Sequence, residues 1–428
     1  MRRRRRVAVL TAVALAAGLS ACAAEAGPPT LTWYINPDAG GQARLAQTCT
    51  EQADGAYTIE TVLLPRQAAA QREQLARRLA AKDSSIDIMS LDPPFIPELA
   101  EPGFLAPVPG DVAETTTEGV VQGAIDGASW DGELVTVPFW ANTQLLWYRK
   151  SVAEAAGLDM SKPVTWQQLI DAAESQDKLL AVQGQKNESL TVWINALVAS
   201  AGGEIITNPE AAGQDIELGL ETEAGRQAAE VIGQIGSSGV GGPGLPTEDE
   251  PASLTLFQGD DGSFMVNWPF VWSSTVTAVE DGSLDQALLE DIGWTTYPLT
   301  AEGGEVTPPY GGINLGVGAF SEHPDLAFQA VECIVTPEHQ AEYFASDGNP
   351  AAASQAYEDP AVQEAYPMYA AIRDSLEQAV PRPQTPFYNE VSTGLQETWH
   401  PPASVDPDAT PEESTSFITS VLRGESLL

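Results

Sequence analysis

The feature that most constrains the fold is the alternation of strand-like and helix-like segments early in the chain. Residues 31–35, 57–64 and 85–92 are apolar runs typical of strands. The intervening segments 40–53 and 66–83 have the apolar spacing of amphipathic helices. A βαβαβ order predicts a parallel sheet with right-handed crossovers, and ligands of such sheets lie beyond the carboxyl ends of strands. We therefore predict an α/β fold and regard Asn36, Asp38 and Asp92, which follow these strands, as candidate ligand-binding residues.

The remainder of the chain reads as mostly helical. Two β-type runs within residues 133–148 are broken at Asn142, and further strands are expected at 263–268 and 311–320. The expected helices are 165–174, 189–203, 223–236, 250–257, 324–335, 337–346, 360–379, 388–398 and 411–423. With 43% hydrophobic residues, the chain can build two domains with cores of their own.

The N-terminus has the layout of a secretory signal. Five arginines precede a short apolar stretch, and Leu19-Ser20-Ala21-Cys22 resembles the bacterial lipobox, in which the cysteine is lipidated. This predicts a signal peptide over residues 1–21, a tether over 22–30 and a lipid anchor at Cys22 on the outer face of the cytoplasmic membrane. A plainly secreted protein in which Cys22 is incidental is the alternative.

The chain is strongly acidic. It has 20 Lys and Arg against 60 Asp and Glu, a net charge of −40. Loss of residues 1–21 would remove five arginines and no acid, which makes the charge −45. Such a charge repels phosphate backbones, so we exclude nucleic acid as a partner. The acids are scattered along the chain, which is typical of a solubilising surface.

Motifs for catalysis, cofactors and metals are missing from the sequence. It contains no G-x-S-x-G, H-E-x-x-H, C-x-x-C or G-x-x-x-x-G-K-[ST] pattern. We expect His323, His339 and His400 to be surface or capping residues, and we predict no metal site and no cofactor. In an oxidising compartment, Cys49 and Cys333 are expected to form a disulfide, although each could also be a buried thiol.

Aromatic residues stand beside single polar side chains in segments expected to be buried. This pattern fits a carbohydrate, because a pyranose stacks its C–H faces on aromatic rings and needs donors and acceptors for its hydroxyls. Ordinary core packing is the alternative. The pairs are Trp140 with Asn142, Trp268 with Asn267, and Phe387 and Tyr388 with Arg382.

Six stretches carry a resemblance to a known family. They are TVLLPRQAAAQREQLARRLA, DIMSLDPPF, NTQLLWYR, VNWPFVW, GGINLGV and RPQTPFY. In order and approximate spacing, over nearly the whole chain after the signal, they resemble the extracellular solute-binding proteins of carbohydrate ABC importers. The resemblance is to the maltose-binding-like group and, within it, to the trehalose-binding lipoproteins of mycobacteria.

The resemblance implies a two-lobe, periplasmic-binding-protein-like fold with a hinge and an interlobe ligand cleft. The N-terminal lobe would comprise residues 31–141 plus about 311–345, and the helix-rich C-terminal lobe residues 142–310 plus about 346–428. The implied ligand contacts are Asp92, Asn142 and Glu250 for hydroxyls, Trp268 for stacking, the backbone of Gly312 and Ile313, and Arg382. Cys49 and Cys333 also fall where the relatives have cysteines.

Two departures from the family pattern matter. The first loop, INPDAG, aligns poorly, which leaves the contact of Asn36 or Asp38 with ligand open. Phe139-Trp140-Ala141 replaces smaller, more polar residues beside Asn142, which could reshape the pocket for another disaccharide or a glucoside.

The implied function is a monomeric, non-enzymatic substrate-binding protein of an ABC importer. It would bind a disaccharide, trehalose or a related α-glucoside, and deliver it to membrane permease subunits by hinge closure. The alternatives are a lipid-anchored glycoside hydrolase using Asp92 and Glu250 as a carboxylate pair, and a binding protein for another sugar or small solute.

Overall fold

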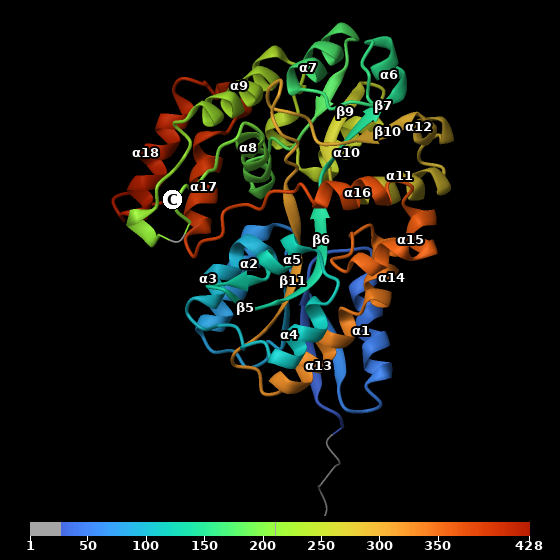
Figure 1. Ribbon diagram of the computed structural model, residues 1–428, viewed down its shortest axis with the longest axis vertical. Coiled ribbons are helices and arrows are strands. Elements are labelled where there is room, and N and C mark those ends of the chain that lie inside the picture. Colours follow the sequence, from blue (N-terminus) through green and yellow to red (C-terminus); the bar gives the residue numbers. More distant parts are fainter. Residues whose placement is uncertain (1–26, 210) are drawn as a thin grey trace, which may run out of the picture.

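The computed structural model describes residues 27–209 and 211–428, which form two lobes. Each lobe has its own sheet covered by helices, and the two are joined by chain crossings beside the long strands at the centre of Figure 1. The α/β prediction with two lobes is therefore confirmed.

The sheet of the first lobe has five strands in the order β2-β1-β3-β11-β6. Strands β1 and β2, and β1 and β3, are parallel, as the βαβαβ order predicts. Strand β11 runs antiparallel to both β3 and β6, so the sheet is mixed. The bounds are β1 (Thr30–Ile35), β2 (Thr58–Leu63), β3 (Ile88–Leu91), β6 (Val137–Thr143) and β11 (Tyr310–Val317).

Both faces of this sheet are buried. Successive side chains of β1 point to opposite faces: Trp33 packs into one hydrophobic cluster and Tyr34 into another. Helices α1, α4, α13 and α14 supply the first cluster, and α2 and α3 the second. The bounds are α1 (Gly41–Gln52), α2 (Ala68–Ala80), η1 (Pro93–Phe95), α3 (Ile96–Ala100), α4 (Gly110–Thr117), α5 (Gln122–Gly127), α13 (Pro324–Ile334) and α14 (Pro337–Asp347). A short hairpin, β4 (Ser129–Trp130) and β5 (Glu133–Leu134), completes this region.

The second lobe is built on a four-stranded sheet in the order β10-β7-β9-β8. Its core surrounds Trp166 and Trp193, whose rings lie 5.9 Å apart. Thr165 and Gln168 form a capping box at the start of the helix that carries Trp166. The strands are β7 (Leu145–Arg149), β8 (Leu179–Ala181), β9 (Gly262–Asn267) and β10 (Ile292–Thr295). The helices are α6 (Lys150–Ala155), α7 (Trp166–Ser175), α8 (Glu188–Ser200), η2 (Gly213–Asp215), α9 (Glu223–Ser238), η3 (Leu245–Thr247), α10 (Glu250–Gln258), α11 (Phe270–Glu280), α12 (Gln286–Asp291), α17 (Tyr388–Thr398), η5 (Pro402–Ser404) and α18 (Thr410–Leu422).

Two details correct the expected elements. The strand break expected at Asn142 lies at Gln144, because Asn142 remains paired with Gly311 inside the first sheet. The helix expected over 360–379 is two helices with Pro367 between them, since proline has no N–H to donate. These are α15 (Pro360–Ala365) and α16 (Tyr369–Leu376), which with η4 (Ser354–Glu358) pack beside the crossing between the lobes.

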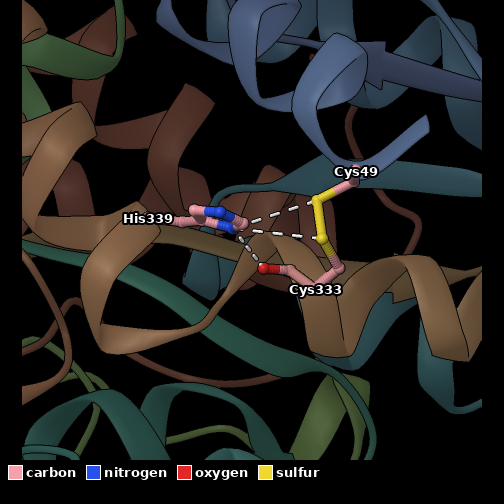
Figure 2. Close-up of side chains that lie close together, drawn as sticks. All are labelled: Cys49, Cys333 and His339. Atoms are coloured by element: carbon pink, nitrogen blue, oxygen red, sulfur yellow. Dashed lines mark hydrogen bonds between the residues drawn. A yellow bond between two sulfur atoms is a disulfide. The ribbon is translucent and has the colours of Figure 1, made fainter. Parts of the chain in front are cut away.

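A disulfide joins the start and the end of the first lobe. Cys49 of α1 and Cys333 of α13 are bonded across 284 residues of sequence (Figure 2). His339 is not a surface residue, in contrast to the expectation: it is buried at the start of α14, and its Nδ1 lies 2.6 Å from the carbonyl oxygen of Cys333. The three residues lie close enough to suit a metal ion, but both sulfur atoms are used by the disulfide.

Within residues 27–209 and 211–428, no helix combines the length and the apolar run needed to cross a bilayer. The predicted signal peptide and the lipidation site Cys22 lie outside the described residues.

Candidate ligand-binding site

The centre of the candidate site is a pair of ion pairs on one arginine. Arg382, in the segment between α16 and α17, donates from Nη2 to Asp92 Oδ1 and from Nη1 to Glu188 Oε1, both at 2.6 Å. Asp92 follows β3 in the first lobe, and Glu188 is the first residue of α8 in the second. The side chains of Arg382, Glu188 and Asp92 are 4%, 11% and 17% exposed. Arg382 therefore links the two lobes through buried charges.

Glu188 was missed by the sequence analysis. Its Oε1 also accepts from the hydroxyl of Tyr388, and its Oε2 accepts from the hydroxyl of Ser392 at 2.7 Å. In the sequence it looks like an acid in the first turn of a helix, after the capping residue Asn187, and such acids are common because they suit the helix dipole. Only the tertiary structure distinguishes it from a capping acid.

Two polar groups of this centre remain open. Arg382 Nε is buried and has no hydrogen-bond partner among the described residues. Asp92 uses Oδ1 for Arg382, and no bond to its Oδ2 occurs within the same part of the chain. Burial raises the pKa of Asp92, Arg382 opposes this rise and Glu188 adds to it. A donor and an acceptor without partners on one ion pair suit the hydroxyl groups of a polyhydroxy ligand.

Glu250 lies next to this centre in the second lobe. It is the first residue of α10, its side chain is partly exposed, and two nearby donors, the Ser189 hydroxyl and the Trp268 indole, act to lower the pKa of its carboxyl group. Ser189 directly follows Glu188 in the sequence, so Glu250 lies close to the segment that carries Glu188. Burial raises the pKa of Glu250, and these donors only partly offset the effect.

Trp268 brings the second lobe against the first. A Cβ added to Gly311 of β11 would lie 2.9 Å from Cη2 of the indole, so the ring lies on the backbone of that strand. Asn267 fixes the tryptophan, because its Oδ1 accepts from the Trp268 N–H at 2.8 Å while its Nδ2 donates to Glu250 O at 3.0 Å. Asn267 thus sets the position of Trp268 relative to Glu250.

Asn142 lies beside this ring on the neighbouring strand. It pairs with Gly311 in the register of β6 and β11. It is partly exposed, and its Oδ1 accepts from the Thr143 N–H at 3.0 Å. Its amide nitrogen has no partner among the described residues, so it can serve as a donor beside Trp268.

Gly312 and Ile313 lie opposite the end of β3. Strand β11 pairs with β3 from Asn314, which lies opposite Leu91, to Val317. The two residues that precede Asn314 in β11 pass beside Asp92 and Pro93 and are not paired with β3. Gly312 has φ +129°, and a Cβ there would lie 2.3 Å from Trp140 O. Glycine is therefore required at this position for the strand to keep its path.

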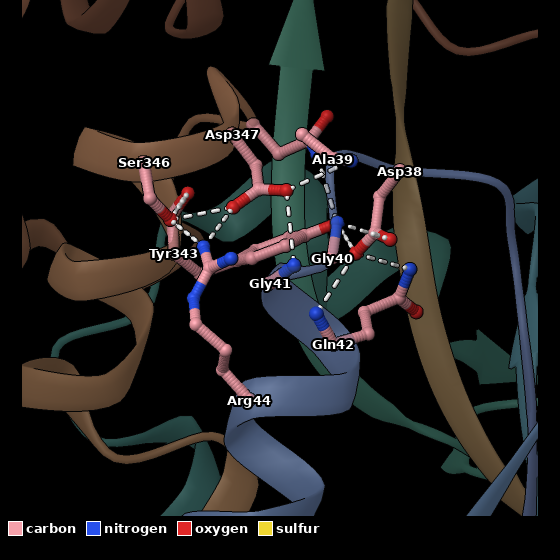
Figure 3. Close-up of polar contacts among 10 residues, drawn as sticks. Asp38, Ala39, Gly40, Gly41, Gln42, Arg44, Tyr343, Ser346 and Asp347 are labelled. Carbon is pink, nitrogen blue, oxygen red and sulfur yellow. Dashed lines mark hydrogen bonds and ion pairs between the residues drawn. The ribbon is translucent and has the colours of Figure 1, made fainter.

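Asn36 and Asp38 differ in how their side chains are used. Asn36 donates to Gln71 Oε1 at 2.8 Å, and its own Oδ1 is buried without a partner in the described chain. Asp38 instead accepts from the N–H groups of Gly40 and Gln42 at 2.9 and 2.8 Å (Figure 3). Asp38 is thus occupied in holding the start of α1, while Asn36 keeps a free acceptor.

Apart from Asn36 and Asp38, the predicted site residues fall into one contiguous region. Neighbouring contacts connect Asp92, Arg382, Glu188, Ser189, Glu250, Trp268, Gly311 and Asn142 in that order. The lobes also touch nearby, because the rings of Phe95 and Tyr388 lie 5.2 Å apart edge to face, and Asn187 Nδ2 donates to Gln67 Oε1 at 3.3 Å. A two-lobed fold with open polar groups at its boundary is typical of ligand-binding proteins.

The comparisons with known proteins define the family. Residues 51–341 match the family described as bacterial extracellular solute-binding protein. A probable ABC transporter-binding protein of Deinococcus radiodurans is 25% identical over 396 residues, which cover 87% of this chain and 88% of that protein.

Solved structures share the fold. Maltose-bound MalE3 of T. maritima superposes with a TM-score of 0.78 at 22% identity, covering 92% of this chain and 99% of that one. A solute-binding protein of Agrobacterium vitis S4 with bound D-mannitol gives a TM-score of 0.72 at 18% identity, covering 93% and 98%. The fold is therefore that of two-lobed binding proteins of the MalE type. The chain belongs to the family of bacterial extracellular solute-binding proteins, which are non-enzymatic transport receptors.

Proposed function

We propose that this chain is the substrate-binding protein of an ABC importer for sugars or polyols. The observation that carries the proposal is the unpaired Nε of Arg382 and the free oxygen of Asp92, in the region at the boundary between two lobes that also holds the indole of Trp268. A polyhydroxy solute needs this combination of charge-assisted hydrogen bonds and an aromatic face. The similarity to a probable ABC transporter-binding protein supports the transport role.

Within that class, we propose a disaccharide, trehalose or a related α-glucoside, as the ligand. Asp92, Asn142, Glu250, Arg382 and Asn36 would bond hydroxyls, and Trp268 would stack on a sugar ring. Gly312 and Ile313 would add backbone contacts along the unpaired edge of β11. The fully used carboxylate of Asp38 argues against its direct contact with ligand.

The proposed mechanism is closure of the two lobes around the solute, followed by delivery to the permease subunits. Because Arg382 contacts both lobes, a solute bound at the boundary between them would change the stability of the closed arrangement. Lipidation at Cys22 would keep the protein, as a monomer, near its permease on the outer face of the cytoplasmic membrane.

A thermal-shift screen of residues 28–428 tests the function. The panel would contain trehalose, maltose, sucrose, glucosylglycerol, mannitol, ribitol and glucose, followed by calorimetry on every compound that raises the melting temperature. Saturable binding of at least one sugar or polyol is expected. A shift with trehalose alone supports the narrower assignment, a shift with another glucoside refutes it, and no shift with any compound refutes a sugar or polyol as ligand.

A further inference from the structure

Glu188 lies where three segments of the second lobe meet. Its Oε1 accepts from Arg382 Nη1 at 2.6 Å and from the Tyr388 hydroxyl, and its Oε2 accepts from the Ser392 hydroxyl at 2.7 Å. The side chain is largely buried. Both oxygens of Glu188 are therefore engaged by donors of the protein itself, in contrast to those of Asp92.

Glu188 belongs to one face of α8 that holds the segment leading into α17. Thr191 and Asn195 lie three and seven residues further on, a spacing that places all three side chains on the same side of a helix. Thr191 Oγ1 lies 2.9 Å from Ser392 Oγ, and Asn195 Nδ2 donates to Pro381 O at 3.2 Å. This face of α8 therefore fixes α17 and the backbone just before the arginine of the site.

Arg382 is attached unequally to its two acids. In the second lobe, Glu188 is held by the hydroxyls of Tyr388 and Ser392 as well as by the guanidinium. In the first lobe, the carboxylate of Asp92 accepts from Arg382 alone among the described residues. An acid that other bonds already hold in place loses less freedom when it pairs with an arginine. The bond to Asp92 is therefore the weaker attachment of Arg382.

The two ion pairs also determine which donor of Arg382 is free. Nη1 and Nη2 are directed to Glu188 and Asp92, and Nε is buried with no partner in the described chain. The guanidinium is a rigid, planar fork, so fixing its two ends fixes the direction of the third donor. Without Glu188, the guanidinium would be free to turn and to take up the open oxygen of Asp92.

Resting on the proposed function, we propose that Glu188 is a positioning residue of the ligand-binding site. It keeps Arg382 on the second lobe with Nε directed to a solute hydroxyl, and it touches no part of the solute itself. The bond from Arg382 to Asp92 is then the contact that breaks when the lobes open and re-forms when they close on a solute. A solute is recognised by an arginine that the protein has already oriented.

Glu188→Gln tests this role in the intact protein, with the sugar or polyol found in the screen. The variant keeps the size of the side chain but places an amide where donors converge, so binding should weaken about tenfold. The loss should appear as faster dissociation in stopped-flow measurements, since the loosened arginine acts in the closed complex. The stoichiometry in calorimetry should stay that of the wild type, because only a loss of folded protein would lower it.

Two further variants separate position from charge. Glu223→Gln is the matched control: Glu223 is also the first residue of a helix, α9, and pairs with Arg226 at 2.7 Å, but this pair is exposed, so affinity should not change. Glu188→Asp keeps the charge but is one methylene too short to bond Arg382 and Ser392 at the observed distances. It should therefore bind about as weakly as Glu188→Gln.

Tyr388→Phe provides a milder test that does not depend on the folding of Glu188→Gln. It keeps the ring that packs edge to face on Phe95 and removes only the hydroxyl that bonds Glu188. Binding should weaken about twofold to fivefold, because Glu188 loses one of the bonds that hold it in place.

The outcomes separate this proposal from the proposed function. Near wild-type affinity in Glu188→Gln, or full affinity in Glu188→Asp, would refute the positioning role and leave the transport role standing. A lower stoichiometry in Glu188→Gln together with unchanged affinity in Tyr388→Phe would refute it as well, because Glu188 would then serve stability alone. If no sugar or polyol binds the wild type, the proposed function fails, and this inference fails with it.

Discussion

Two groups of carboxylates in this protein differ in how fully their oxygens are used. Beside the start of α1, Asp347 accepts from the N–H groups of Ala39 and Gly41 at 3.0 and 3.1 Å and pairs with Arg44 at 2.8 Å (Figure 3). At the boundary between the lobes, Asp92 keeps a free oxygen and Glu250 has no ion pair in the described chain. A carboxylate whose oxygens are satisfied by its own chain holds the fold, whereas one that lies at the lobe boundary and keeps a free oxygen or has no counter-charge is available to a ligand.

The largest expected effect comes from Arg382→Ala. Loss of the guanidinium leaves the buried carboxylates of Asp92 and Glu188 without a cation, which should cost about 3–5 kcal/mol of stability. Binding of the sugar or polyol found in the screen should fall below detection. Urea unfolding and calorimetry measure the two effects.

A matched variant keeps this test interpretable. Arg382→Lys retains one positive charge but loses the fork that reaches both acids, so it should recover stability more than affinity. If Arg382→Ala binds with near-normal affinity, Arg382 is not part of the site.

Trp268→Ala comes next. Removal of the indole deletes the ring proposed to stack on the sugar, and should weaken binding by about 1–3 kcal/mol, or roughly tenfold to a hundredfold. The fold should persist, because the side chain is only partly buried. Trp268→Phe is the control: it keeps a ring and should retain most of the affinity. Equal affinities in the alanine variant and the wild type would place the ligand elsewhere.

How well the sequence predicts this molecule differs between fold and site. The βαβαβ pattern places β1 and β2 to within one residue at each end, because apolar periodicity is a local property, whereas β3 covers only the second half of the strand predicted over 85–92. The antiparallel insertion of β11 between β3 and β6 joins segments more than 150 residues apart, and no local pattern specifies such pairing.

The site shows the same limit. Asp92 is predictable because it ends a buried strand, but Glu188 is indistinguishable from a helix-capping acid until Arg382 is placed against it. His339 has a polar sequence context, yet it is buried beside the disulfide, because α14 packs against α1 and α13. Side chains that act through tertiary contact are those that sequence patterns miss.

Asp347→Ala tests the other half of the comparison. It leaves the buried N–H of Gly41 and that of Ala39 without an acceptor, which should cost about 2 kcal/mol of stability. Affinity for the ligand should fall by less than about tenfold, since the affected loop carries Asn36 but none of the charged site residues. A loss of binding as severe as that of Arg382→Ala would contradict the division into structural and ligand-binding carboxylates.

The smallest effect is expected from Glu248, a buried acid of neither group. Its Oε2 has no partner among the described residues, and burial raises its pKa to about 7. The unfolded chain has the ordinary value near 4.3, so the folded state holds an extra proton between these limits and stability falls as the pH rises through them. Glu248→Gln should therefore lose less stability than the wild type between about pH 5 and pH 8, by at least about 1 kcal/mol.

Urea unfolding across that range measures the difference, with the exposed Glu280→Gln as control. Parallel pH profiles in all three proteins would mean that Glu248 reaches water or a partner when folded. A pH profile of stability that flattens only in Glu248→Gln would show that burial without a partner is enough to raise the pKa of a carboxyl group in this fold. The same physical cause acts on Asp92 and Glu250, where a ligand can supply the missing partner.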